Sequence, residues 1–458
     1  MELFFLFAGL AIVSTAVAIP LEKFMEQKGV IHVIRSSAFA QFTQSNLAGL
    51  FNALCFFFTY LVLSQSLNFH EYNTLDRFFD TDASQWISRL TIHPDGGMPP
   101  IRAIHPAVML ILRPFVWLIS IILNGDKLQA VYVLSALAGA LCVLLIWLIV
   151  KAKTGNTPFA LVTASILGAG TSHLLLSSIL ETYIFSALAL ITFCFLMLNE
   201  KTSLKFSIPM GIVIFGITVT NLAQACILYF LKVPRLKVIM KFILAVIATA
   251  LLLNVLQIQL FPKARPLYKP SSLTFEQRYE YDLFRAPWRL TGRVNLISRA
   301  ILLYGIVAPD PYILTEELGS DVPNFRTFQI ANNAFHVAGY KGFSDIVVKF
   351  WVAIIGLAII LFITNFIKTS KKENFFSVSL ILCMAFNFGL HVLYGDDPML
   401  YSPDWAYALV LFVSSSLGKW ADRKWLQLGL IVFLGMIIYT NLNLINQIME
   451  VSLPFYGK

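Results

Sequence analysis

The chain has 458 residues, of which 58% are hydrophobic and only 13% charged, and its net charge is +9. A soluble domain carries about 25% charged residues, so this composition excludes an ordinary soluble protein. Uncharged runs of roughly 20 residues, long enough to cross a bilayer, recur along the chain. The chain does not show the alternating segments of about ten residues that build a membrane β-barrel. We therefore predict an all-α fold, a single polytopic membrane domain over residues 1–458 with about 10–11 transmembrane helices.

Charge-free runs predict where the spans lie. They cover residues 3–20, 46–67, 128–150, 157–180, 182–199, 206–231, 242–262, 350–367, 374–393 and 425–445, with a shorter run at 405–418. The first run lacks a basic start and an obvious cleavage site, so we expect a membrane helix rather than a signal peptide. All five cysteines (Cys55, Cys142, Cys194, Cys226 and Cys383) lie inside these runs. No disulfide framework is therefore predicted.

Charge separates the two sides of the predicted membrane. The segment 21–46 and the short linkers between spans carry 17 Lys+Arg and 5 Asp+Glu, a charge of +12, which leaves −3 for the other side. Cytoplasmic loops are enriched in Lys and Arg, so the basic side is predicted to lie inside. Two long loops, 68–126 and 263–349, then lie outside. The net charge reflects membrane topology, and no nucleic-acid partner is expected.

The run 206–231 does not fit this topology as one span, because basic Lys205 and Lys232 flank it and both should lie inside. We predict two half-spans that turn near Thr220–Asn221. Non-helical backbone at membrane depth is tolerated where protein surrounds it or where it lines a cavity. The run therefore indicates a central cavity.

The loop 68–126 is rich in polar groups. Its stretch "FDTDASQW" (79–86) holds Asp80 and Asp82. The apolar segment 101–125 contains Arg102 and His105 and is interrupted at 113–114 by Arg-Pro, which is unfavourable at a bilayer centre. We predict that 101–125 is an interfacial helix on the outer leaflet.

The order of these features resembles the GT-C glycosyltransferases, the class that includes protein O-mannosyltransferases and lipid A aminoarabinose transferases. The matching residues are, in chain order, Asp82-Ala83 and Trp86, then Arg102 and His105-Pro106, then Gly125, and then Glu181 in "LETYIF". The resemblance covers residues 47–200, and the multispan remainder more loosely. Here an additional span, 3–20, precedes the aspartate, and the glutamate that often stands beside it is missing. The identity of the sugar is therefore left open.

The resemblance implies an inverting enzyme that moves a sugar from a polyprenyl-phosphate carrier to a glycan, lipid or protein acceptor at the outer face of the membrane. A base must take the proton of the acceptor hydroxyl, and cations should stabilise the leaving phosphate. Asp82 is the predicted base and Asp80 the second choice. The two acids could also hold a divalent cation. The structural alternative is that they are solvated or cap the helix that starts at Ala83.

Several other residues are candidates for substrate binding. Arg102 and His105 could contact the carrier phosphate or the sugar, or they could reach lipid headgroups and fix the turn before Pro106. Glu181 could belong to the site or favour a helix dipole. Tyr394 lies in the stretch 391–405.

The same stretch also contains Tyr401 and Trp405, and its three aromatics could stack on sugar faces or form the aromatic belt of a membrane interface. Asp396 and Asp397 are reserve acids. The second loop contains "RAPWRLTGRVNLISRAILLYG" (285–305), predicted as an amphipathic interfacial helix starting at Pro287.

In that helix Arg289 and Arg293 would share a polar face and could grip the carrier phosphate or lipid headgroups. Leu290, Ile297 and Ile301 would face lipid.

Two other functions compete with glycosyl transfer. A transporter or flippase of lipid-linked sugars would place charges within its spans and often contains inverted repeats; the spans here are nearly free of charge. A polymerase or ligase of surface polysaccharide would also keep a large outer loop, and its chemistry would centre on arginines of the second loop. For the glycosyltransferase we expect a multi-pass protein of the bacterial cytoplasmic membrane with its active site on the outer side.

Overall fold

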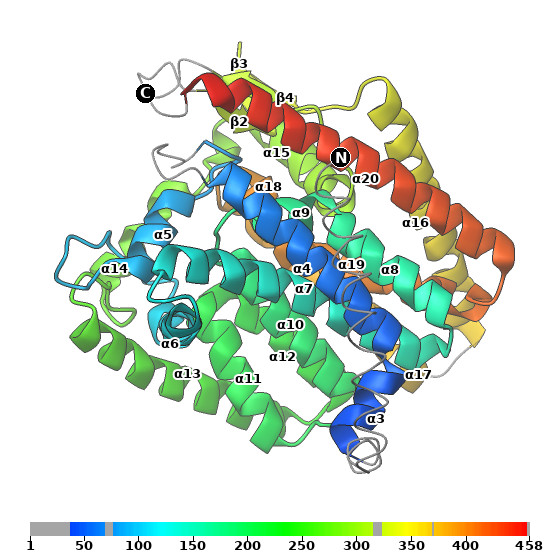
Figure 1. Ribbon diagram of the computed structural model, residues 1–458, viewed down its shortest axis with the longest axis horizontal. Helices are drawn as coiled ribbons and strands as arrows, with labels where there is room; N and C mark the ends of the chain where they lie inside the picture. The colour runs from blue at the N-terminus through cyan, green and yellow to red at the C-terminus, as the bar shows by residue number, and fades with distance from the viewer. Residues whose placement is uncertain (1–36, 69–76, 315–322, 369–370, 456–458) are drawn as a thin grey trace. The chain divides into compact units, whose positions relative to one another are not determined.

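The computed structural model describes residues 37–68, 77–314, 323–368 and 371–455 (Figure 1). The chain divides into two compact units, Met1–Phe51 and Asn52–Lys458. In the first unit, Ser37 begins helix α3 (Ala38–Ser45) by accepting a hydrogen bond from the backbone N–H of Ala40. The predicted span 3–20 lies outside the described residues.

The remaining α-helices are α4 (Leu47–Leu67), α5 (Ala83–Thr91), α6 (Val108–Ile122), α7 (Lys127–Thr154), α8 (Thr157–Ala169), α9 (Thr171–Leu176), α10 (Tyr183–Leu198), α11 (Leu204–Ile217), α12 (Leu222–Lys232), α13 (Leu236–Leu260), α14 (Pro270–Thr274), α15 (Pro287–Arg299), α16 (Phe343–Lys368), α17 (Lys371–Leu393), α18 (Pro398–Tyr401), α19 (Pro403–Leu417) and α20 (Lys424–Ser452). Short 3₁₀ turns are η1 (Val219–Asn221), η2 (Glu276–Tyr279), η3 (Leu283–Arg285), η5 (Gly418–Trp420) and η6 (Leu453–Phe455), and η4 (Ala300–Tyr304) is a π turn.

Six of the described helices are long and apolar enough to cross a membrane. They are α4, α7, α13, α16, the Asn374–Leu393 part of α17, and α20 with its extension to Phe455. Helices α6, α8, α10 and α11 are apolar but shorter. The prediction of a helical membrane protein is confirmed at this level.

The predicted span 157–180 is wrong as a single helix, because the chain breaks at Gly170 between α8 and α9. A Cβ at Gly170 would lie 2.9 Å from the carbonyl oxygen of Gly305. The backbone N–H of Ser172 donates to that same carbonyl at 3.1 Å. The close approach of another loop therefore requires the glycine and interrupts the helix.

The predicted interruption in 206–231 is confirmed. Helix α11 ends at Ile217, the chain turns through η1, and α12 begins at Leu222. The polar backbone groups at the break find partners in the segment 104–107: Val219 N–H donates to Ile104 O at 3.1 Å, and Gly216 O accepts from Ala107 N–H at 2.9 Å. These bonds stabilise non-helical backbone between apolar helices.

The loop 263–349 contains two antiparallel pairs of strands that the all-α prediction missed. Strand β1 (Tyr312–Leu314) pairs with β2 (Asn324–Arg326), and β3 (Phe328–Ala331) pairs with β4 (Ala334–Val337). The second pair is a hairpin that turns at residues 332–333, two asparagines with φ of 50° and 56°. Asparagine tolerates this left-handed conformation, which a two-residue hairpin turn requires.

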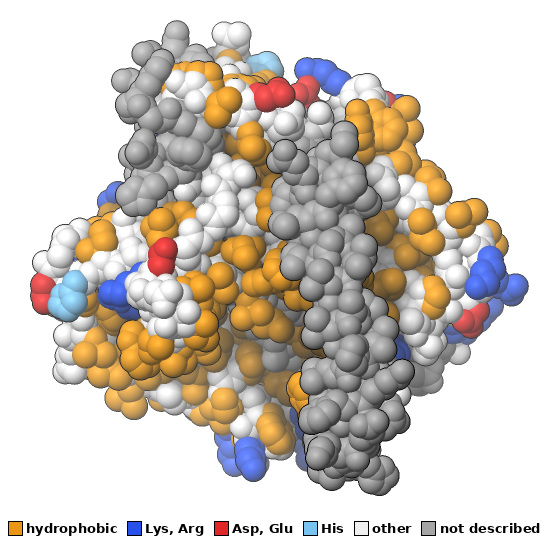
Figure 2. Space-filling model, in the orientation of Figure 1, with side chains coloured by type: hydrophobic (Ala, Val, Ile, Leu, Met, Phe, Trp, Pro, Cys, Tyr) orange, Lys and Arg blue, Asp and Glu red, His pale blue; other side chains and the backbone are white. Residues whose placement is uncertain are grey.

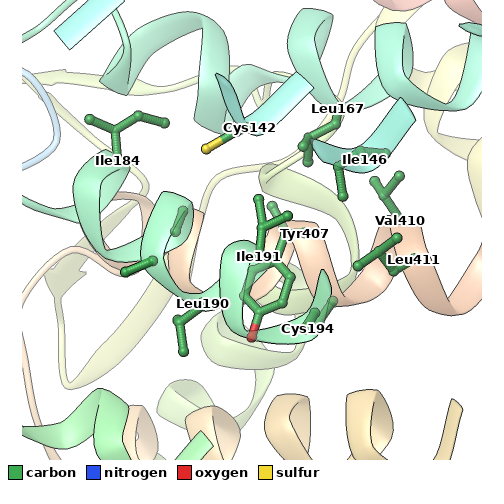
Figure 3. Close-up of a cluster of buried hydrophobic side chains, with 14 of the residues drawn as sticks. Cys142, Ile146, Leu167, Ile184, Leu190, Ile191, Cys194, Tyr407, Val410 and Leu411 are labelled. Atoms are coloured by element: carbon green, nitrogen blue, oxygen red, sulfur yellow. The ribbon is translucent and has the colours of Figure 1, made fainter. Parts of the chain in front are cut away.

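A large apolar core lies where α7, α8, α10 and α19 pack together. Figure 3 shows part of it, with Cys142 and Ile146 from α7, Leu167 from α8, Ile191 from α10 and Leu411 from α19. These side chains are almost completely buried. All five cysteines lie within the described residues and are free thiols.

The predicted orientation in the membrane can be tested with single cysteines in a variant whose five natural cysteines are replaced. Figure 2 shows hydrophobic side chains across the middle of one face and charged side chains mostly toward its margins. We expect Asp95→Cys and Lys341→Cys, which are exposed positions in the two long loops, to react with an impermeant thiol reagent added to whole cells. Lys371→Cys should react only after permeabilisation. Labelling of Lys371→Cys alone in intact cells would mean that the chain has the opposite orientation in the membrane.

Candidate functional site

Asp82 occupies the position before α5, where a sharp turn presents it. Phe325 pairs with this segment, since its carbonyl accepts from Phe79 N–H at 2.9 Å and its N–H donates to Arg77 O at 2.8 Å. Phe79 and Asp80 both adopt left-handed φ values, 54° and 67°. The Asp82 side chain makes no capping hydrogen bond to α5, so the capping interpretation is wrong.

The backbone of Asp82 is held by Glu181. The Asp82 N–H donates to Glu181 Oε1 at 2.6 Å, and Thr182 N–H donates to Glu181 Oε2 at 2.9 Å. Glu181 therefore joins the start of α5 to the start of α10, two segments that are 99 residues apart in the chain. This contact brings together two acids of the predicted site.

Burial raises the pKa of Asp82, and Asp80 acts in the same direction, whereas Arg89 and Arg102 oppose the shift. A carboxylate with a raised pKa is a stronger base, and the two arginines favour its charged form. Across the described residues, the Asp82 side chain accepts no hydrogen bond. This environment suits a general base.

Glu181 is 2% exposed, and burial, followed by the nearby charge of Asp82, raises its pKa to about 8. Glutamate ordinarily titrates at 4.5. The folded protein therefore binds more protons than the unfolded chain between these two pH values, and its free energy of unfolding falls as the pH rises through that range.

We expect Glu181→Gln to abolish this fall, because the amide oxygen can still accept the Asp82 N–H but cannot ionise. Unfolding of the detergent-solubilised wild type and variant between pH 5 and pH 8.5 measures the effect. The wild type should lose stability relative to Glu181→Gln toward high pH. Parallel curves for the two proteins would mean that Glu181 titrates in the ordinary range.

Arg89 is a site residue that the sequence pattern did not single out. It is 3% exposed, and its guanidinium lies 4.5 Å from the ring centre of Trp86. Its Nε donates to Pro100 O at 3.0 Å. Burial lowers the pKa of Arg89, while Asp82 and Glu181 raise it. The guanidinium thus provides a fixed cation near both acids.

Arg102 lies in a charged network that joins the two long loops. Its guanidinium pairs with Glu276 of η2 and donates from Nη2 to the Tyr394 hydroxyl at 2.7 Å. Tyr394 in turn donates to Glu276 Oε2 at 3.0 Å. The Arg102 guanidinium also packs 4.2 Å from the ring centre of Tyr279. Two sequence-predicted residues, Arg102 and Tyr394, are therefore in direct contact.

His105 holds the loop rather than offering a charge. Its ring is buried, and burial lowers its pKa to about 3, so it is neutral at physiological pH. Its Nδ1 lies 2.6 Å from Ile217 O. Since a carbonyl only accepts, we assign the proton to Nδ1. His105 therefore fixes the turn against the end of α11, as in the structural alternative.

Asp80 has a different partner from Asp82. Its Oδ1 pairs with Arg326 Nη1 at 2.6 Å, and both side chains are largely buried. Burial, followed by the adjacent Asp80, raises the pKa of Asp396 to about 6. Within the described parts of the chain, no group of three or more His, Cys, Asp or Glu side chains lies close enough together to hold a metal ion. The Asp80 carboxylate is thus engaged in a pairing of β2 with the turn before α5.

The predicted orientation of the second-loop helix is wrong. Helix α15 begins at Pro287 as predicted, but it buries Arg293, Ile297 and η4 residue Ile301. Arg293 makes four hydrogen bonds to backbone carbonyls, which belong to His391, Tyr394, Gly395 and Asp396.

Arg289 is only partly exposed and lies over Trp288. The two arginines therefore have separate roles. Arg293 organises the 391–396 segment because its donors match one carbonyl in the last turn of α17 and three carbonyls just beyond it.

The aromatic-belt interpretation of 391–405 is also wrong for two of its residues. Trp405 is fully buried, and its Nε1 donates to Ala300 O at 3.2 Å. Tyr401 is buried and stacks on His391 with ring centres 4.4 Å apart. These aromatics face protein because the 391–405 segment folds inward over η4.

A cavity of about 540 Å³ lies beside this network. Its walls combine the break between α11 and α12, the start of α10, the end of α17 and the segment that holds η2. The lining residues are Ile104, Tyr183, Thr218, Thr220, Glu276, Glu280, Tyr281, Leu390, His391, Leu393, Tyr394, Tyr401 and Asp404. The cavity predicted from the interrupted 206–231 run is thus present, and the two threonines that flank the break line it.

Asp82 does not itself line this cavity but adjoins it through its neighbours. Tyr183 follows Glu181 by two residues, and Arg102 contacts both Glu276 and Tyr394 of the wall.

Comparison of the chain with protein-family models, curated proteins and solved structures finds no match. The functional argument therefore depends on the residues and geometry of this site.

Proposed function

We propose that the protein is an inverting glycosyltransferase of GT-C type that moves a sugar from a polyprenyl-phosphate carrier to an acceptor hydroxyl. The observation that supports this most is the environment of Asp82. Its carboxylate has no ion pair or hydrogen bond among the described residues, burial raises its pKa, and Arg89 and Arg102 lie near it. A base and nearby cations are the groups that this reaction requires.

In the proposed reaction, Asp82 takes the proton of the acceptor hydroxyl as its oxygen attacks the anomeric carbon. The bond from this carbon to the phosphate oxygen breaks on the opposite face, and the phosphate leaves with the electron pair. The configuration of the sugar inverts. Arg102 and Arg89 stabilise the charge that develops on the phosphate. Glu181 fixes the backbone of Asp82 and thereby its position.

The site is proposed to lie on the outer side of a bacterial cytoplasmic membrane, where carrier and acceptor meet. The carrier's lipid tail stays in the bilayer while its phosphate and sugar reach the rim. Holding reactants in line can contribute roughly 7–11 kcal/mol to lowering the barrier. The acceptor is a glycan, a lipid or a protein hydroxyl.

A transporter of the lipid-linked sugar is the second candidate. The break between α11 and α12 favours it, because transporters also build substrate sites from interrupted helices. The two functions differ in whether the bond between sugar and phosphate breaks.

The proposal is tested by incubating the purified protein with a panel of radiolabelled polyprenyl-phosphate sugars and a cell-envelope acceptor fraction. We expect at least one donor to lose its label to the acceptor and to release bare polyprenyl phosphate. If every donor is recovered intact although the protein binds it, glycosyl transfer is excluded for those sugars.

A further inference from the structure

The wall of the cavity is acidic. Glu276, Glu280 and Asp404 line it, and none of the described lining residues is a lysine or arginine. Glu276 forms an ion pair with Arg102. No ion pair is found for Glu280 or Asp404 among the described residues. A phosphate that entered this space would therefore meet carboxylates rather than cations.

Asp404 differs from an ordinary acid at a helix start. It lies in the first turn of α19, where a negative charge is favourable. It is nevertheless 3% exposed, and in the described residues its buried Oδ1 has no donor in good hydrogen-bond geometry, although the side chain of Asn221 lies close to it. A buried polar atom left unpaired costs free energy, so such atoms in native proteins usually have a partner. The cavity beside Asp404 is where a ligand could supply it.

Other parts of the wall fit a sugar ring. Tyr183 and Tyr401 meet edge to face with ring centres 5.1 Å apart, and both line the cavity. The Nδ1 of His391, another lining residue, is also buried and has no hydrogen-bond partner in the part of the chain that the structure describes. Thr218 and Thr220 add hydroxyl groups from the helix break. Sugars present both apolar C–H faces and hydroxyl donors, which match aromatic rings and a carboxylate.

We infer that this cavity holds the sugar of the donor while the carrier phosphate stays outside it, and that Asp404 recognises the sugar by accepting hydrogen bonds from its hydroxyl groups. The inference rests on the proposed function and adds a specificity-determining residue to it. The phosphate then lies toward Arg102 and Arg89, which places the anomeric carbon between the cavity and Asp82.

The test compares two lipids, bare decaprenyl phosphate and a decaprenyl-phosphate sugar that the wild type accepts, by calorimetric titration into detergent-solubilised protein. Asp404→Asn should weaken binding of the sugar-bearing lipid about 10-fold, the size expected when a buried hydrogen bond is lost. Binding of the bare carrier should change less than about threefold. Asp345→Asn is the matched control, because Asp345 also lies in the first turn of a helix but is partly exposed and pairs with Lys349. It should leave both affinities unchanged.

Equal weakening for both lipids, or no weakening, would overturn the inference. Asparagine has nearly the size and shape of aspartic acid, so Asp404→Asn should still fold, and a thermal melt of each variant checks this. If Asp404→Asn does unfold, Thr220→Val on the same wall must show the selective loss instead. A different result would contradict the proposed function itself: the wild type binds both lipids but transfers no sugar.

Discussion

Asp82→Asn is expected to lower turnover about 100- to 10,000-fold, the contribution that general-base catalysis typically makes. Asparagine keeps the shape of the side chain but cannot accept the acceptor's proton. Because the Asp82 carboxylate makes no capping bond to α5, its replacement should not disturb the helix start. The affinity for the carrier and the amount of folded protein should stay near the wild-type level. Initial rates with saturating donor, together with a binding titration, measure both effects.

Asp80→Asn provides the matched control. Asp80 adopts φ of 67°, which asparagine tolerates well, and its carboxylate pairs with Arg326 rather than with the site. We expect a smaller loss of turnover and a lower stability of the loop. If a divalent ion bridges Asp80 and Asp82, a chelator should abolish activity in the wild type. Wild-type turnover by Asp82→Asn would exclude it as the base and direct attention to Asp80, Glu181 or Asp396.

Arg293→Gln is expected to cause the largest loss of stability. Arg293 is fully buried and bonds four carbonyls of the 391–396 segment. Glutamine can satisfy at most two of them. At ~1–3 kcal/mol for each buried acceptor left unpaired, two lost partners should cost about 2–6 kcal/mol. Denaturation in detergent should report this loss, and the affinity of the remaining folded protein for the carrier should fall only through disorder near Tyr394.

Arg289→Gln separates this effect from phosphate binding. Arg289 lies four residues earlier on α15 but is partly exposed, so its loss should hardly change stability. If Arg289→Gln weakens carrier binding, the predicted phosphate role belongs to Arg289. If Arg293→Gln leaves stability unchanged, the loop does not depend on its four hydrogen bonds.

Much of the helical framework could be predicted because long apolar runs have few other solutions in a membrane. The break near Thr220 was also predictable, since Lys205 and Lys232 could not both lie inside if one helix joined them. In contrast, the break at Gly170 depends on the approach of Gly305 from a distant segment. No local pattern in 157–180 reports that approach.

The candidate site could be predicted only in part for a similar reason. The order of motifs along the chain assigned Asp82 and Glu181 to one site, and the two residues are in contact. The pairing of Arg102 with Glu276 joins two loops, and neither side chain identifies its partner in sequence. Helical periodicity placed Arg293 on a polar face because arginine is normally exposed. Its burial is possible only because a set of unpaired carbonyls lies opposite it.

The most direct test of the account distinguishes breaking the donor's sugar–phosphate bond from moving the donor. Proteoliposomes containing the wild type or Asp82→Asn are supplied with a donor labelled in the sugar and with the cell-envelope acceptor fraction. The intact donor in each leaflet, the labelled acceptor and the bare polyprenyl phosphate are measured over time. The account predicts that bare carrier and labelled acceptor form together in the wild type and are nearly absent in Asp82→Asn. Movement of intact donor across the bilayer at equal rates in both proteins, with no bare carrier formed, would contradict it.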